Sequence, residues 1–155
     1  AMGLRAFARI YAGWGVGAEW YADRHYEREG FEDVETFVRE SYEAGFARSD
    51  ADDMLAQIRT WQSADVGRLT GGDLRAALGR VQARVLLMPC DTDTYFTVDA
   101  ARKEAEMLGE DRATLRPIRS AAGHRAGDPH RPGLEEEHAF LTAAVRDFIA
   151  ATHTS

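Results

Sequence analysis

The chain has 155 residues, 45% of them hydrophobic, with 26 acidic and 19 basic side chains and a formal net charge of -7. This length fits one domain, and the acidic balance with a single lysine, Lys103, argues against a nucleic-acid partner. No apolar run approaches the roughly 18 residues that a membrane-spanning helix needs, so no membrane association is expected.

The only cysteine in the sequence, Cys90, excludes an internal disulfide and fits a reducing compartment. The first residues, AMGLRAFARIY, lack the apolar core of a secretion signal, so we expect a cytoplasmic protein. Cys90 is a candidate reactive thiol, but a small buried residue after a strand is the favoured interpretation.

Most of the first half of the chain, residues 3–79, has the apolar spacing of helices. The expected helices cover residues 4–11, 19–29 and 32–46, then one that Asp50 caps, and a short one at 73–78. The helix after Asp50 carries Met54, Leu55, Ile58 and Trp61 at helical spacing. Aromatic and aliphatic stripes of this kind usually pack in a core or an interface, which is the role expected here.

The second half of the chain has the pattern of a βαβ unit. The apolar run 85–88 predicts a strand buried on both faces, residues 98–108 an amphipathic helix, and residues 114–118 a second, parallel strand. Residues 123–133, rich in glycine and proline, predict a long surface loop, and residues 134–152 a closing helix. The expected fold class is therefore α/β.

A parallel sheet of two strands with apolar faces needs further strands and helices to cover it. We therefore expect the chain to be the final part of a larger doubly wound α/β sheet. The remaining strands then lie on another polypeptide, or the chain is a cleaved or truncated piece of a longer one.

Carboxylates and a histidine follow the two expected strands. Asp91 and Asp93 come just after the first strand, and His124 follows the second. Because parallel strands end at the same edge of a sheet, one of these aspartates and His124 are expected to meet there. A buried carboxylate fixes the tautomer of an imidazole and leaves its other nitrogen free to act as a base. The spacing leaves open which aspartate is the acid, and also that all three are ordinary turn or loop residues.

A serine nucleophile is not evident in the chain. The pattern G-x-S-x-G is absent, and Ser41, Ser49 and Ser63 fall in the helical region, while Ser120 precedes the histidine loop. The chain alone is therefore expected to form no acyl-enzyme.

A metal site is also not expected. His124, Asp128, His130 and His138 lie close together in the sequence, but their spacing matches no recognised set of zinc ligands.

Nearly the whole chain resembles the C-terminal half of the homoserine O-acetyltransferase-like α/β-hydrolases. The segment DADDMLAQIRTWQSADV is similar to the cap of that family, the helical layer that covers the site, and GDLRAALGRVQARVLLMPCDTDTYF follows it. The family's acid lies in the pattern Asp, any residue, a large apolar or aromatic residue, then Phe or Tyr, which Asp93-Thr94-Tyr95-Phe96 matches. IRSAAGH is similar to the approach to the family's catalytic histidine and matches His124.

The resemblance implies a helical cap at residues 3–79 and the C-terminal part of the α/β core at residues 80–152. It implies that Asp93 and His124 serve a serine on a missing N-terminal half, in an O-acyltransferase or esterase that is inactive without that half. It also implies a small-molecule acyl acceptor, acyl-CoA as a candidate co-substrate with no tightly bound cofactor, and a dimer through the cap helices.

Two arginines are candidate substrate-binding residues. Family members that act on homoserine usually have an aspartate, which binds the substrate amino group, where this chain has Arg125. A cation there would repel an ammonium group, so homoserine itself is disfavoured. Arg9 is similar in position to a family arginine that binds a substrate carboxylate, although an exposed helix arginine is the favoured interpretation.

The leading hypothesis is therefore an acyl-transferring or ester-cleaving α/β-hydrolase, to which this chain supplies the acid and the histidine. The rival hypothesis is a non-catalytic binding or oligomerisation module derived from such an enzyme. The absent nucleophile and the aromatic cap favour the rival.

Overall fold

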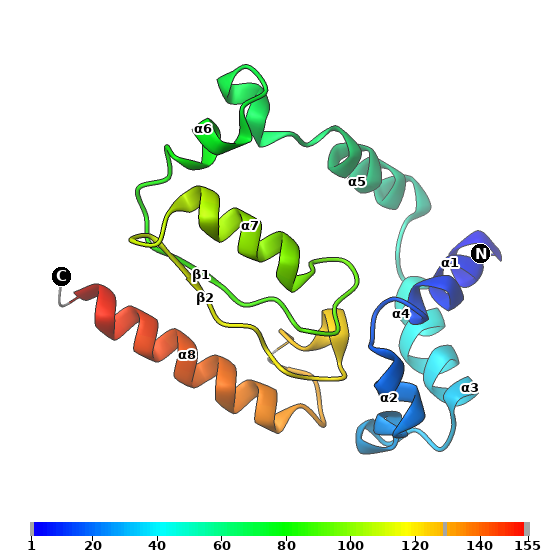
Figure 1. Cartoon of the computed structure of the whole chain (residues 1–155). Helices are drawn as coiled ribbons and strands as arrows, with labels where there is room; N and C mark the ends of the chain where they lie inside the picture. The colour runs from blue at the N-terminus through cyan, green and yellow to red at the C-terminus, as the bar shows by residue number, and fades with distance from the viewer. Residues whose placement is uncertain (1, 129, 154–155) are drawn as a thin grey trace.

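A computed structural model describes residues 2–128 and 130–153, and its elements follow the predicted order (Figure 1). The helices of the first half are α1 (Met2–Ala12), α2 (Ala18–Ala22), η1 (His25–Glu29), α3 (Val34–Phe37), η2 (Val38–Glu43), α4 (Ala44–Phe46), α5 (Ala51–Ser63), η3 (Val66–Thr70) and α6 (Leu74–Leu78). The second half contains β1 (Val85–Leu87), α7 (Val98–Leu108), β2 (Ala113–Leu115), η4 (Gly123–Arg125) and α8 (Glu135–His153).

Aspartate side chains begin several of these helices by accepting hydrogen bonds from free backbone amides of the first turn. Asp50 caps α5 as predicted, with its carboxylate accepting from the amides of Asp52 and Asp53. The helix predicted at residues 19–29 is instead divided into α2 and η1, because Arg24 adopts the left-handed conformation with φ of 55°. The remaining helical predictions of the first half are confirmed.

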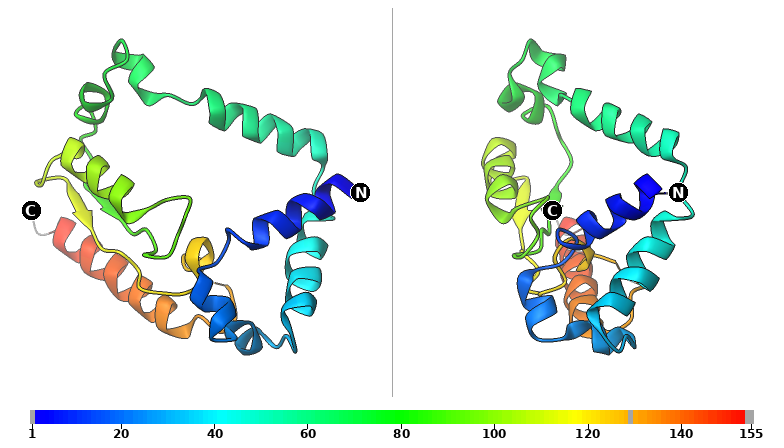
Figure 2. Two further views of the ribbon diagram at one scale, coloured as in Figure 1. Left: turned by 45° about the vertical axis from the view of Figure 1, so that its right-hand side comes forward. Right: turned by 90° about the vertical axis from the view of Figure 1, so that its right-hand side faces the viewer.

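Strands β1 and β2 pair in parallel, with Val85 opposite Ala113, and helices α7 and α8 lie on either side of the pair (Figures 1 and 2). The parallel βαβ unit is therefore confirmed. The prediction of a strand buried on both faces is wrong for this chain, since every residue of β1 is only half-buried. The reason is that the described sheet has two strands, so each strand has one hydrogen-bonded neighbour.

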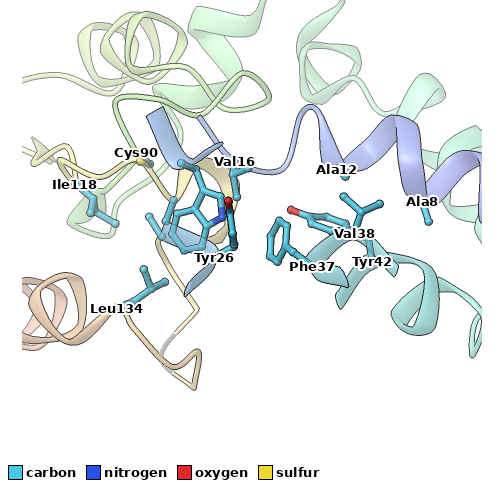
Figure 3. Close-up of a cluster of buried hydrophobic side chains, with 13 residues drawn as sticks. Ala8, Ala12, Val16, Tyr26, Phe37, Val38, Tyr42, Cys90, Ile118 and Leu134 are labelled. Atoms are coloured by element: carbon cyan, nitrogen blue, oxygen red, sulfur yellow. The ribbon is translucent and has the colours of Figure 1, made fainter. Parts of the chain in front are cut away.

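The core joins the helical half to the strand ends (Figure 3). Its largest fully buried side chains are Trp20 and Phe37 from the helical half, Ile118 after β2, and Leu134 before α8. Phe37 contacts the rings of five other aromatic residues, Trp20, Tyr21, Tyr26, Phe31 and Tyr42. Burial of this aromatic group stabilises the packing of the helical half, and Ile118 and Leu134 of the same core connect it to the second half of the chain.

Helix α5 departs from the sequence-based expectation. It carries no buried residue, and Figure 2 shows it extended between the helical half and α6. Leu55, Ile58 and Trp61 are all exposed, so the predicted packing face is open to solvent within the described structure. No described helix is both long and apolar enough to cross a membrane.

Candidate functional site

The two strand ends are held side by side beyond the regular sheet. Cys90 and Ile118 form a further parallel bridge, in which the Ile118 amide donates to Pro89 O at 2.8 Å and the Asp91 amide donates to Ile118 O at 2.9 Å. The Thr92 hydroxyl then donates to Ser120 O at 2.6 Å. These bonds bring the loop after β1 against the loop after β2.

Asp93 and His124 meet at this junction. Asp93 Oδ2 lies 3.0 Å from His124 Nδ1, and Asp93 is buried, with 8% of its surface exposed. Asp93 Oδ1 accepts from the amides of Tyr95 at 2.7 Å and Phe96 at 3.2 Å, so the carboxylate is held by its own turn. Because a carboxylate can only accept, the proton of the neutral ring belongs on Nδ1 and Nε2 carries the free lone pair. No hydrogen bond to Nε2 forms within residues 2–128 and 130–153.

Asp91, the competing acid, has a different partner. It is exposed, and its carboxylate accepts from the Ser120 amide at 3.1 Å. In the structure, His124 therefore pairs with Asp93, while Asp91 connects the loop after β1 to the loop after β2.

Gly123, which precedes the histidine, fits where a larger residue could not. Its φ is +58°, and a Cβ built there would lie 2.9 Å from Val16 Cα. Beside it, the Gly17 amide donates to Ala121 O at 2.8 Å. The segment between α1 and α2 therefore packs directly against the turn that contains His124. In the sequence, the glycine directly before His124 is the only signal of this contact.

Aromatic rings flank the imidazole. Tyr95 lies 5.2 Å from the ring centroid of His124, and Phe96 is stacked on it at 5.5 Å and 28°. Trp61 of α5 contacts both Tyr95 and Phe96. Burial raises the pKa of the Tyr95 phenol, with the Asp93 charge as a smaller cause, so this side chain is neutral at physiological pH. Sequence reasoning did not assign these rings to the site, although Tyr95 and Phe96 lie in the acid motif.

Arg125 points into the core. Its guanidinium forms an ion pair with Glu29, with Nη2 at 2.6 Å from Oε2, and the two side chains are 8% and 4% exposed. It also lies 5.1 to 5.7 Å from the ring centroids of Phe37, Trp20 and Tyr42. Arg125 is therefore surrounded by protein groups, although within the described residues its Nε and Nη1 have no hydrogen-bond partner, and substrate binding by this residue stays a prediction.

The loop that contains Arg125 is partly internal. Gly123, Arg125 and Ala126 are buried, so the prediction of a surface loop at residues 123–133 is wrong for its first part. The ion pair with Glu29 and the contact with Val16 account for this burial. Pro129 lies outside the described residues.

Arg9 lies on α1 and is engaged by two carboxylates. Its guanidinium donates to Glu43 and, with Nη1 at 3.1 Å, to Glu35, and these bonds raise its pKa. The side chain is 39% exposed. A substrate carboxylate would have to compete with both glutamates, so substrate binding by Arg9 also stays a prediction.

The other candidate residues, those considered for a metal site and Cys90, do not form a cluster around His124. His138 Nε2 lies 2.8 Å from Asp128 O, and within the described residues no three His, Cys, Asp or Glu side chains gather as a metal site. Cys90 is free and buried, as favoured from the sequence, and burial raises the pKa of its thiol. A raised thiol pKa lowers the thiolate fraction, which disfavours a nucleophilic role.

Two curated proteins are similar in sequence. The chain is 36% identical over 124 residues to an ethyl acetate hydrolase of Pseudomonas veronii and 37% identical over 125 residues to a probable esterase of Corynebacterium glutamicum. Each match covers 80% of this chain but 35% of the relative, so the chain spans about a third of the length of these relatives. No protein-family model matches the chain.

Solved structures show the same fold. An acetyl esterase, MekB, superposes with a TM-score of 0.81 at 32% identity over 99% of this chain and 42% of its own. An acetylester hydrolase from Corynebacterium glutamicum gives 0.77 at 31% identity, over 88% of this chain and 40% of its own. A homoserine O-acetyltransferase from Bacillus anthracis gives 0.66 at 23% identity, over 90% and 40%, and shares the fold.

Proposed function

We propose that this chain supplies the acid and the base of an ester-cleaving enzyme. The premise is that the chain matches the C-terminal part of α/β-hydrolases similar to homoserine O-acetyltransferase. The observation that carries the proposal is the 3.0 Å contact between buried Asp93 and the Nδ1 of His124. In this proposal the serine nucleophile and the oxyanion hole come from the part of the fold that these 155 residues do not include.

His124 then works as the general base and acid. Nε2 takes the proton of the serine hydroxyl as the serine oxygen attacks the ester carbonyl, and it returns that proton to the departing alcohol. A water molecule, activated by the same nitrogen, then cleaves the acyl-enzyme and releases the acid. Asp93 holds the Nδ1 tautomer and stabilises the imidazolium that forms.

Hydrolysis of short acyl esters is the favoured reaction, because the relatives that are more than 30% identical are named as an ethyl acetate hydrolase, a probable esterase, an acetyl esterase and an acetylester hydrolase. Transfer to a small alcohol, with acyl-CoA as donor, is the alternative from the same intermediate. The two reactions differ in the acyl donor, an ester or acyl-CoA, and in whether water or an alcohol accepts the acyl group.

The test uses the protein encoded by the complete reading frame that contains this chain, with p-nitrophenyl acetate as substrate. We expect His124→Ala to lower kcat by on the order of 10⁴-fold or more and Asp93→Asn by about 10⁴-fold, because members of a triad act as a unit. Asp91→Asn is the matched control, since Asp91 follows the same strand but does not contact His124. We expect its kcat to stay within about 10-fold of the parent, because only indirect loop contacts change.

Unchanged turnover in His124→Ala would contradict the proposal, as would labelling of no serine by a fluorophosphonate probe. Absence of ester turnover in the parent protein would favour the non-catalytic binding module instead. If acetyl-CoA plus an alcohol gives an ester faster than water gives acetate, transfer replaces hydrolysis while both catalytic assignments stand.

A further inference from the structure

A cavity of about 300 Å³ lies in the helical half, between helices η2 and α4 and two arginines that follow the histidine, Arg125 and Arg131. Tyr11 also lines this cavity. The ring of Tyr11 lies 5.7 Å from that of Tyr95, which in turn lies 5.2 Å from the imidazole of His124. Two aromatic side chains therefore connect the cavity to the histidine.

Four polar groups of the cavity lining are buried without a hydrogen-bond partner in the described part of the chain. They are the Tyr42 hydroxyl, Nε and Nη1 of Arg125, and Nε of Arg131. Tyr42 is 6% and Arg125 is 8% exposed, and Figure 3 shows Tyr42 beside Phe37 in the core. Burial raises the pKa of the Tyr42 phenol, so the hydroxyl keeps its proton. All four groups are therefore donors, and a buried donor without an acceptor is unfavourable.

The charges around the cavity do not balance. Glu29, with a side chain 4% exposed, pairs with Nη2 of Arg125 and lies 3.4 Å from Nη1 of Arg131, so two guanidinium groups share one buried carboxylate. Asp128 lies 3.5 Å from Nε of Arg131, but its side chain is 42% exposed and water screens its charge. Among the described residues, no acidic side chain lines the cavity. The cluster therefore has one buried positive charge in surplus.

We propose that this cavity binds the carboxylate of a small organic acid, held by Arg125, Arg131 and Tyr42. One negative charge compensates the surplus, and the carboxylate oxygens accept from the donors that lack partners. Water in the cavity would satisfy the hydroxyl but would leave the positive charge uncompensated. Tyr11 and Phe46 contribute aromatic surface to the lining, which favours an acid with a short alkyl chain.

The test is calorimetric titration of the protein encoded by the complete reading frame with butyrate and with butyramide, a neutral analogue of the same size. We expect saturable binding of butyrate with a Kd on the order of 1 mM or lower. Butyramide is expected to bind at least about 10-fold more weakly, because it cannot compensate the charge.

Variants of the lining locate the site. Tyr42→Phe is expected to weaken butyrate binding about 10-fold, because it removes a hydrogen bond to a charged group. Arg131→Gln is expected to weaken it by a similar or larger factor of roughly 10-fold, while Glu29 keeps its pair with Arg125. Tyr21→Phe is the matched control and should leave the affinity unchanged, since the Tyr21 hydroxyl already donates to Ala12 O at 2.5 Å and does not line the cavity.

The proposal is overturned if butyrate does not saturate a site or if butyramide binds equally well. It is also overturned if both lining variants keep the parent affinity and the parent circular dichroism, since butyrate would then bind elsewhere, for example at the histidine as a reaction product. Competition with ethyl acetate that is lost in Tyr42→Phe would identify the acid as part of a substrate or product. Binding without competition would identify a free acid, and both results support the site. The inference goes beyond the proposed function and is tested apart from it, because the titrations require no turnover.

Discussion

At the scale of single residues, the ion pair between Arg125 and Glu29 explains why the position after the histidine can hold a cation. Both side chains are almost completely buried, and the guanidinium also faces three aromatic rings. A buried pair of this kind contributes little beyond an apolar pair, but the loss of one partner leaves an uncompensated charge. The pair joins the η4 turn, which carries His124, to the end of η1.

We therefore expect Glu29→Gln to lower the free energy of unfolding by about 3–5 kcal/mol, because Arg125 would remain charged and buried. Glu27→Gln is the matched control, since Glu27 pairs with Arg24 at a position where the two side chains are 60% and 49% exposed. Its effect should be much smaller than that of Glu29→Gln, because exposed ion pairs contribute little to stability. Urea unfolding monitored by tryptophan fluorescence measures the free energy of unfolding of both variants. Equal losses would contradict the prediction, because they would show that burial does not increase the cost of breaking the pair.

At the scale of elements, the η4 turn depends on a glycine. Gly123 combines a left-handed conformation with close contact to the backbone of Val16. A side chain there meets two independent penalties, the strained φ and the collision with backbone that has no rotamer to change. The turn that presents the histidine is thus positioned by the segment between α1 and α2.

Gly123→Ala is expected to destabilise the fold by at least about 1–3 kcal/mol from the strained conformation alone. It should also reduce esterase activity, because the contact with Val16 must open and His124 moves with it. Gly127→Ala, four residues on, is the control, since a Cβ there has no neighbour within 4 Å and its φ is not positive. Thermal unfolding and kcat are the measurements, and an unchanged Tm in Gly123→Ala would contradict the assignment.

At the scale of the whole molecule, much apolar surface has no cover within the described residues. Leu55 and Ile58 on α5 and Val145 and Ile149 on α8 are 38–50% exposed, although their spacing predicts packing faces. The two strands are half-buried for the same reason. Surfaces of this kind mark contacts with further protein, either the rest of an α/β sheet or a second copy.

The 155-residue chain on its own is therefore expected to associate with itself, and dimerisation through the helical half stays a prediction. Size-exclusion chromatography with light scattering over a range of concentrations measures this. Substitution of Leu55 and Ile58 by lysine should shift the population toward the monomer if α5 forms the contact, while Leu69→Lys on neighbouring η3 serves as the comparison. A monomeric mass for the unsubstituted chain at high concentration would contradict the prediction.

Local patterns were sufficient for most of the elements and for the expectation that an aspartate after β1 lies near His124. Apolar periodicity and capping aspartates depend on neighbours in the sequence, so helices such as α5 and α8 and the parallel pair β1 and β2 were predictable. The choice between Asp91 and Asp93 came from the family pattern, and the hydrogen bond to His124 agrees with it.

Contacts between segments that are distant in the sequence could not be predicted from local patterns. The burial of Arg125 depends on Glu29, which the chain brings from 96 residues away, and the surroundings of His124 depend on Trp61 of α5. The exposure of α5 and the half-burial of the strands depend on which elements are present to cover them. Residue type and spacing specify each element and its apolar face, whereas the partner of that face is set by three-dimensional packing, which no local pattern encodes.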